Sequence, residues 1–185
     1  MPDYPTVIAL VQQIFVRRNP YNHHMDRCGS LALPLAIALE FSPYECEMFV
    51  VGAHIHDLGK LLIREDVLNL PRKLSKSEMA MVKQHALEGY KVIVELNYEP
   101  LICDIVLHHH ERFDGNGYPD RLRGEHISKY ARAMTMLDVW DALRSQRSYR
   151  PAFTAEGARD IMRSESGKVF DPAILEVFLQ KVAGE

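Results

Sequence analysis

The chain has 185 residues, of which 47% are hydrophobic and 25% charged, as expected for one globular domain with a hydrophobic core. Its net charge of −3 offers no overall attraction to nucleic acid polymers or anionic membranes. Three widely spaced cysteines exclude a disulfide framework and a CxxC zinc site and favour buried, reduced thiols. The N-terminal segment lacks the basic region of a secretory signal, and no apolar stretch reaches the ~20 residues of a membrane span. We therefore expect a cytoplasmic protein without membrane insertion.

Helical periodicity dominates the first third of the chain. Apolar residues from Val7 to Phe15 recur at the spacing of an amphipathic helix. A second helix is predicted from about 21 to 40, where Pro34 should kink or split it. Ser42-Pro43 then has the form of an N-cap followed by proline at the first helical position, which predicts a helix running into "GAHIHD".

The remaining helices are also predicted by their caps. Ser75 and Glu78 form an S-x-x-E capping box that opens a helix through Ile93, and Pro100 begins one that ends in the histidines. Glycines and prolines predict a loop over 111–127. Further helices are expected to begin after Ser128, Thr154 and Asp171. Because no stretch alternates with the period of a strand, we predict an all-α bundle, in one domain over 1–185.

Histidines and aspartates recur at intervals that match this bundle. His56 and Asp57 adjoin a predicted helix end, His85 lies on a helix, His110 ends the next, and Asp138 lies on the one after. The separations between His56, His85, His110 and Asp138 are 29, 25 and 28 residues, and each fits a helix, a short loop and a helix. Such spacing can place these four side chains at the same level along the axis of a helical bundle.

This set of residues is typical of a metal centre. Imidazoles and carboxylates without thiolates suit Fe, Mn, Zn or Ni. The candidate ligands are His24, His56, Asp57, His85, His109, His110 and Asp138. Seven ligands exceed the four of a tetrahedral zinc ion, which favours two metals.

The order of these motifs resembles the HD-GYP domain family of the HD phosphohydrolase superfamily. The H-D-x-G-K run covers 56–60, and the H…HD…D pattern falls on His24, His56, Asp57 and Asp138. The run "HHERFDGNGYP" at 109–119 matches the H-H-E-x-x-D-G-x-G-Y-P signature without a gap. The resemblance extends from about 24 to 178, and it implies an HD-domain helical bundle.

The resemblance also implies an activity in bacterial signalling. Members of this family are phosphodiesterases that hydrolyse the second messenger cyclic di-GMP with a hydroxide activated by two divalent metals. By that match, His24, His56, Asp57 and Asp138 hold one metal, and Asp57 bridges to a second held by His85, His109 and His110. Fe or Mn is the expected metal, with Zn, Ni or Mg as alternatives.

The resemblance suggests contacts for the substrate as well. Lys60, one turn after Asp57, is the expected catalytic and phosphate-binding cation, and Arg147 and Arg150 occupy the family's basic positions. The family also suggests that Tyr118 and Pro119 could form a docking surface for a diguanylate cyclase.

Neighbouring residues have other predicted roles. His108 matches no motif position, and we interpret it as a bystander whose loss should spare metal binding. His54 should face away from the metals, because it lies two residues before His56. Asp114 should bond the local backbone, and Gly115 and Gly117 should supply positive φ in the loop.

Two departures from the family pattern refine the expected activity. Pro20 stands where some members carry a glutamate that recruits a third metal, so we expect two metals and the linear product pGpG. Leu70 stands where the family often has a lysine, which removes one candidate substrate contact. The chain leaves no room for a receiver or sensory domain, so we expect either that such a domain is on a separate chain or that the activity is constitutive.

Two alternatives remain open at the level of sequence. The chain could be an adaptor that binds the nucleotide or docks a diguanylate cyclase. It could also hydrolyse another cyclic dinucleotide, because metal motifs do not read the base. No acid for the leaving group is identified.

Overall fold

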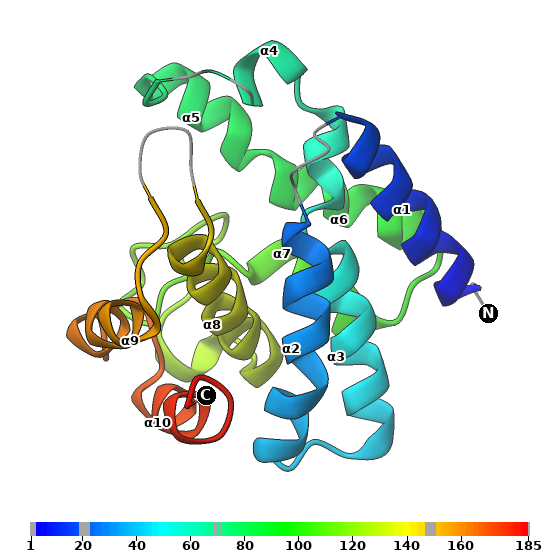
Figure 1. The fold of residues 1–185 in the computed structure, drawn as a ribbon. Coiled ribbons are helices and arrows are strands. Elements are labelled where there is room, and N and C mark those ends of the chain that lie inside the picture. The colour runs from blue at the N-terminus through cyan, green and yellow to red at the C-terminus, as the bar shows by residue number, and fades with distance from the viewer. Residues whose placement is uncertain (1–2, 19–22, 69, 71, 147–150, 185) are drawn as a thin grey trace.

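The computed structural model describes residues 3–18, 23–68, 70, 72–146 and 151–184, and these residues form a bundle of helices (Figure 1). The longer helices are α1 (Tyr4–Arg18), α2 (His24–Ala38), α3 (Pro43–Ile55), α6 (His85–Glu95), α7 (Pro100–His108), α8 (Lys129–Arg144), α9 (Ala155–Ser164) and α10 (Pro172–Lys181). Shorter elements are η1 (Leu58–Leu62), α4 (Glu65–Leu68), α5 (Lys76–Lys83) and η2 (Gly124–His126). In the described ranges the only β feature is an isolated bridge between Ser166 and Phe170, which confirms the all-α class.

The predicted caps are present. Ser42 and Ser75 each accept a hydrogen bond from the backbone N–H of the glutamate three residues later, and that glutamate accepts one from the serine N–H at 2.7 Å. Ser128, Thr154 and Asp171 cap α8, α9 and α10 in the same way through their side-chain oxygens. Local side-chain chemistry therefore fixes where these helices begin.

At Pro34, where the sequence predicts a kink or a split, α2 is continuous and is not split. One predicted helix differs in the structure. The helix predicted from Ser75 to Ile93 is divided, because α5 ends at Lys83 and α6 begins at His85. At this break the Nδ1 of His85 donates to the carbonyl oxygen of Val82 at 2.7 Å. The histidine therefore lies at a helix end, where its ring can turn into the bundle.

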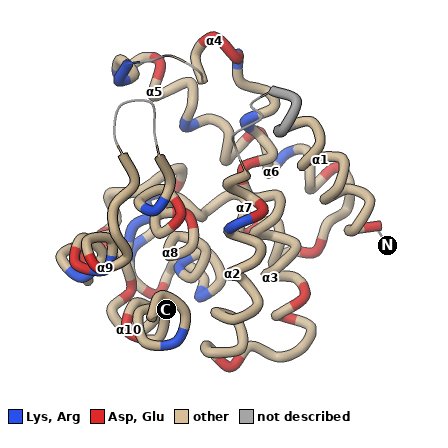
Figure 2. The backbone as a smooth tube through the Cα atoms, in the orientation of Figure 1, with Lys and Arg blue, Asp and Glu red and all other residues tan. Residues whose placement is uncertain are grey.

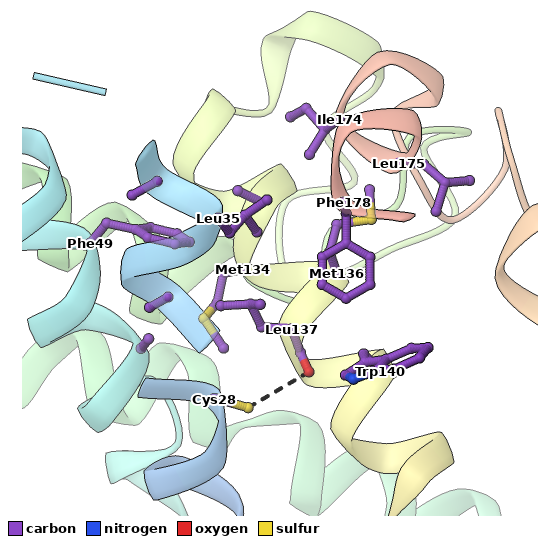
Figure 3. Packing of buried hydrophobic residues seen from close by; sticks show 14 of the residues in the cluster. Cys28, Leu35, Phe49, Met134, Met136, Leu137, Trp140, Ile174, Leu175 and Phe178 are labelled. Atoms are coloured by element: carbon purple, nitrogen blue, oxygen red, sulfur yellow. Dashed lines mark hydrogen bonds between the residues drawn. The ribbon is translucent and has the colours of Figure 1, made fainter. Parts of the chain in front are cut away.

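The two largest apolar clusters of buried residues hold much of the bundle together. The larger joins α2, α3, α8, α9 and α10, and Figure 3 shows Leu35, Met134, Leu137 and Phe178 meeting in it. In the same view the Cys28 thiol donates to the carbonyl oxygen of Leu137 at 3.7 Å. The smaller cluster joins α1, α3, α6 and α7. All three cysteines are buried and unpaired, as predicted.

Figure 2 shows that the Lys, Arg, Asp and Glu positions are spread over the helices, with both signs of charge interspersed. None of the helices, over the part of the chain that is described, combines the length and apolar character that crossing a bilayer requires.

The glycine of the H-D-x-G-K run has a packing role. A Cβ on Gly59 would lie 1.9 Å from the carbonyl oxygen of His85 and 2.6 Å from the backbone nitrogen of Gly89. The short η1 helix can therefore approach α6 only because both glycines lack side chains. This contact sets the distance between Asp57, which precedes η1, and His85.

We predict that Gly59→Ala lowers the free energy of unfolding by roughly 1–3 kcal/mol, because rigid backbone atoms must move to admit the methyl group. Urea denaturation in the presence of a chelator measures the change without a metal contribution. Gly184→Ala is the control, because its Cβ would meet nothing closer than 3.4 Å. Equal stability of the Gly59→Ala variant and the wild type would contradict this account of the contact.

Candidate metal centre

Five elements bring the seven predicted ligands together. His24 is the first residue of α2, and His56 and Asp57 follow the end of α3. His85 opens α6, and His109 and His110 follow the end of α7. Asp138 alone comes from the middle of a helix, α8. Helix ends suit this purpose because adjacent residues there need not diverge as they do within a helix.

Asp57 lies between two pairs of imidazoles. Its Oδ1 is 3.3 Å from the Nε2 of His85 and 3.8 Å from that of His109. Its Oδ2 is 3.6 Å from the Nε2 of His56 and 3.7 Å from that of His24. Each carboxylate oxygen therefore faces one pair, which is the arrangement of a bridging ligand.

The ligand atoms form two overlapping groups. Those of Asp57, His85, His109 and His110 lie within 4.8 Å of one another, and so do those of His24, His56 and Asp57. Asp138 lies between the groups, with Oδ1 3.2 Å from the Nε2 of His24 and Oδ2 3.6 Å from the Nδ1 of His110. The sequence-based assignment placed Asp138 with the first group only, whereas the structure places it beside both.

The backbone sets the tautomers of three of these histidines. In His56, His85 and His109, the Nδ1 lies 2.9, 2.7 and 3.0 Å from the carbonyl oxygen of the residue three positions earlier. A carbonyl oxygen only accepts, so each Nδ1 carries the proton and each Nε2 directs a lone pair into the centre. Such outer hydrogen bonds are typical of metal-ligating histidines.

The residues fit divalent cations. The Nε2 atoms of His85 and His109 lie 3.2 Å apart, and neither carries a proton to place between them. The Oδ1 of Asp57 is buried and accepts no hydrogen bond from any described residue. The two Nε2 lone pairs point toward one another, and the carboxylate oxygen beside them has no hydrogen-bond donor among the described residues. This arrangement favours a cation between the three atoms.

The charge states of His56, His110 and Asp57 agree with this role. Burial lowers the pKa of His56 to about 3, and burial also holds the pKa of His110 well below its usual range. For Asp57, burial would raise the pKa, but Lys60 and the surrounding imidazoles outweigh it and keep the pKa well below its ordinary value. Neutral imidazoles and ionised carboxylates are the forms that bind metals. His24 differs: burial would lower its pKa, but Asp138 and Asp141 outweigh burial and raise the pKa well above its usual range.

Asp141 is a functional candidate that the sequence analysis missed. Its Oδ2 accepts from the Nδ1 of His24 at 2.6 Å and from the Nη2 of Arg27 at 2.9 Å. Burial raises the pKa of Asp141, yet His24 and Arg27 lower it to about 2 overall. The signal in the sequence is the spacing of Asp138 and Asp141, because residues three apart share a helix face.

The residues of the centre differ in their exposure. His56, Asp57, His85 and His109 are buried, whereas the side chains of His110 and Lys60 are 25% and 29% exposed. The Nζ of Lys60 lies 2.5 Å from the Oδ2 of Asp57, so a partly exposed positive charge adjoins the buried carboxylate.

Two of the other histidines lie outside the centre, as predicted. His108 pairs through Nδ1 with Asp104 at 2.7 Å and through Nε2 with Asp120 at 3.0 Å. The Nδ1 of His54 lies 3.1 Å from the Nε2 of Gln12, on the side of α3 that faces α1.

The loop beside the centre is built on Glu111. Its Oε1 accepts from the backbone N–H groups of Asp120 and Arg121 at 2.7 and 2.9 Å. Gly115 has a φ of +81°, as predicted. The expectation of positive φ at Gly117 is wrong: this residue is required because a Cβ would lie 2.4 Å from the backbone nitrogen of Arg112.

Tyr118 borders the centre. Its ring stacks on that of His110 with centroids 4.9 Å apart. Burial and the charges of Asp57 and Asp138 raise the pKa of the Tyr118 hydroxyl. Arg147, Arg150 and Pro20 lie outside the described residues, so their predicted roles stay predictions.

An all-α bundle that gathers histidines and aspartates at helix ends defines a helical domain with a metal centre. The chain belongs to the HD domain family, whose profile matches residues 8–174. The structure is also similar to that of an HDG"Y"P protein from Bdellovibrio bacteriovorus, with a TM-score of 0.70 and 23% identity over 85% of this chain and 51% of that one. It resembles the HD domain of a Listeria monocytogenes phosphodiesterase with a TM-score of 0.63 and 16% identity, over 94% and 93% of the two chains.

Curated relatives share more sequence. The cyclic di-GMP phosphodiesterase response regulator RpfG of Xanthomonas campestris is 34% identical over 95% of this chain and 47% of its own length. A cyclic di-GMP phosphodiesterase of Pseudomonas aeruginosa is 36% identical over 88% and 39%. A 3'3'-cGAMP-specific phosphodiesterase of Vibrio cholerae is 30% identical over 94% and 34%. The chain thus spans less than half the length of these relatives, and they confirm the HD-GYP resemblance.

We predict that Asp141→Asn weakens metal binding by about 10- to 100-fold, because the ring of His24 loses the carboxylate that orients it. Isothermal titration calorimetry of the metal-free protein with Mn²⁺ measures the affinity. Asp160→Asn on α9, an exposed aspartate paired only with Arg163 among the described residues, is the control. Unchanged affinity in Asp141→Asn would show that this carboxylate does not support the centre.

We predict that His108 and His110 differ in their effect on metal content. His110→Ala should lose about one equivalent of metal per chain, because its ring belongs to the Asp57, His85 and His109 group. His108→Ala should retain the wild-type content, since both ring nitrogens bond carboxylates outside the centre. Elemental analysis of both purified variants tests the contrast, and equal losses would refute the assignment.

Proposed function

We propose that the chain is a metal-dependent phosphodiesterase that hydrolyses cyclic di-GMP to the linear dinucleotide pGpG. Relatives that are 34% and 36% identical are named cyclic di-GMP phosphodiesterases, and they support this substrate. The observation that carries the proposal is the position of Asp57, with one carboxylate oxygen toward each pair of imidazoles. A centre arranged in this way suits two metals.

The described residues divide between the two proposed metals. His24, His56, Asp57 and Asp138 would hold one, and Asp57, His85, His109 and His110 the other. Fe or Mn is the proposed metal, because the ligands are imidazoles and carboxylates without thiolate. When bound, two such cations act as Lewis acids toward the oxygens of a phosphate, and they also lower the pKa of water enough for hydroxide to be available at neutral pH.

The protein contributes position and charge. The outer hydrogen bonds of His56, His85 and His109 fix their rings before any ligand arrives, which lowers the cost of organising the site. Lys60 is partly exposed beside Asp57, where its ammonium can contact the phosphate under attack. We propose Arg147 and Arg150 as further phosphate contacts on family position alone.

A second substrate deserves the same assay. The 30% identical Vibrio cholerae relative is named as specific for 3'3'-cGAMP, so guanine at both positions is one of two options. The buried ligands do not distinguish these bases, because the phosphodiester group is chemically the same whether its sugar carries guanine or adenine.

The adaptor alternative rests on Tyr118. Its ring lies between the His110 ring and the Lys83 ammonium, at 4.9 and 4.7 Å respectively. Both contacts favour a role beside the centre over a free docking surface for a diguanylate cyclase. A regulator on another chain and a cytoplasmic location stay predictions, as does a single domain over 1–185.

We predict that protein loaded with Mn²⁺ or Fe²⁺ cleaves cyclic di-GMP and that Asp57→Ala lowers kcat by about a thousandfold or more, because both metals lose their shared ligand. Chromatography identifies pGpG or GMP as the product and compares 3'3'-cGAMP as substrate. Lys91→Ala, on an exposed side chain that pairs with Glu88, should keep the wild-type rate. Loaded wild-type protein that leaves every cyclic dinucleotide intact would refute the proposed function.

A further inference from the structure

Helix α5 is the least covered of the described helices near the centre. None of its eight residues is buried, and Met79 and Met81 are each 42% exposed. In Figure 1 α5 stands at the edge of the bundle, next to α4 and leading into α6. A helix that exposes apolar side chains in this way has an open face for a ligand.

A surface hollow of about 340 Å³ lies on α5 and the turn that precedes it. It is lined by Leu74, Ser75, Lys76, Met79, Ala80 and Lys83. The lining thus combines apolar surface with two ammonium groups. Its volume is within the lower range of small-ligand sites.

Lys83 connects this hollow to the metal centre. It lines the hollow, and its Nζ lies 4.7 Å from the centroid of the Tyr118 ring. That ring stacks on the ring of the candidate ligand His110, with centroids 4.9 Å apart and an interplanar angle of 29°. Two successive ring contacts therefore separate the Lys83 ammonium from the centre. A cation–π contact can hold the ammonium there without neutralising it.

Lys83 has no carboxylate partner in the part of the chain that the structure describes. No ion pair joins Lys76 or Lys83 to a carboxylate among the described residues, whereas Lys60 pairs with Asp57 and Arg72 with Glu78. Positive charge that no described carboxylate neutralises, beside a centre that is suited to phosphate, favours an anionic ligand that extends beyond the metals.

We propose that Lys83 and the α5 hollow form the subsite for the second nucleotide of the cyclic dinucleotide, a proposal that rests on the proposed phosphodiesterase function. A cyclic dinucleotide carries two phosphates in one ring. While one reacts at the metals, the other lies nearby and binds the Lys83 ammonium. The base attached on that side packs on the apolar surface of Met79 and Ala80, since thioether and methyl groups suit the flat face of a purine. Lys76 lies at the same hollow and adds positive charge.

The test compares two substrates. Cyclic di-GMP has a second phosphate and bases, whereas bis(p-nitrophenyl) phosphate has one phosphate and neither base nor sugar. For Lys83→Ala we expect the KM for cyclic di-GMP to rise about tenfold, with kcat changed far less, because a charge-assisted contact to a non-reacting group is lost. The KM for the small diester should rise much less. Lys83→Arg should restore most of the affinity for cyclic di-GMP, and Met79→Ala should give an intermediate KM.

Three controls separate the outcomes. Metal content of Lys83→Ala should equal that of the wild type, and Lys91→Ala should show the wild-type KM for both substrates. A KM for cyclic di-GMP that stays within about twofold of the wild type in Lys83→Ala, with active enzyme, overturns the subsite alone. Equal increases of KM for the two substrates also overturn it, because they would indicate general charge loss. If loaded wild-type protein cleaves no cyclic dinucleotide, the proposed function fails and the subsite fails with it.

Discussion

The buried carboxylate of Asp57 requires compensating positive charge, and the surrounding structure is arranged around that requirement. An ionised group removed from water is costly unless it is paired or binds a metal. Lys60 supplies one partner, but it reaches only Oδ2, and the buried Oδ1 accepts no hydrogen bond from the described residues. Imidazoles surround this carboxylate, and the neutral ones present lone pairs instead of protons. The arrangement therefore favours a cation beside this carboxylate.

Most of the candidate ligands meet at one centre because they lie at helix ends. A residue within a helix shares its face only with residues three or four positions away. Adjacent residues such as His56 and Asp57, or His109 and His110, can face one centre where the helix stops. Each of those ends also offers backbone carbonyls, and the outer bonds of His56, His85 and His109 use them. The same helix ends thus place the rings and set their tautomers.

Much of this arrangement could be predicted from the sequence because it is locally encoded. Capping serines three residues before a glutamate specify helix starts by themselves, and those predictions were confirmed. The break at Gln84 could not be predicted, since no proline or glycine marks it; tertiary packing of η1 against α6 through Gly59 and Gly89 accompanies it. Asp141 was missed because its role depends on α2 and α8 meeting, and periodicity does not reveal which helices meet. The close approach that explains Gly117 is likewise visible only in three dimensions.

The residues that would hold the metals are mostly buried, whereas those that could contact the rest of a ligand are exposed. Most of the candidate ligands are buried, whereas Lys60 and His110 are partly exposed and Lys83 lines the hollow on α5. Changes at these exposed residues can alter contacts with a ligand without disturbing the buried hydrogen bonds that orient His56, His85 and His109. Relatives named for cyclic di-GMP and for 3'3'-cGAMP both match over most of this chain, which is the pattern expected if a shared centre serves different bases. Under the proposed function, recognition of the base would fall to exposed residues outside the buried centre, because a phosphodiester presents the same oxygens whichever purine its sugar carries.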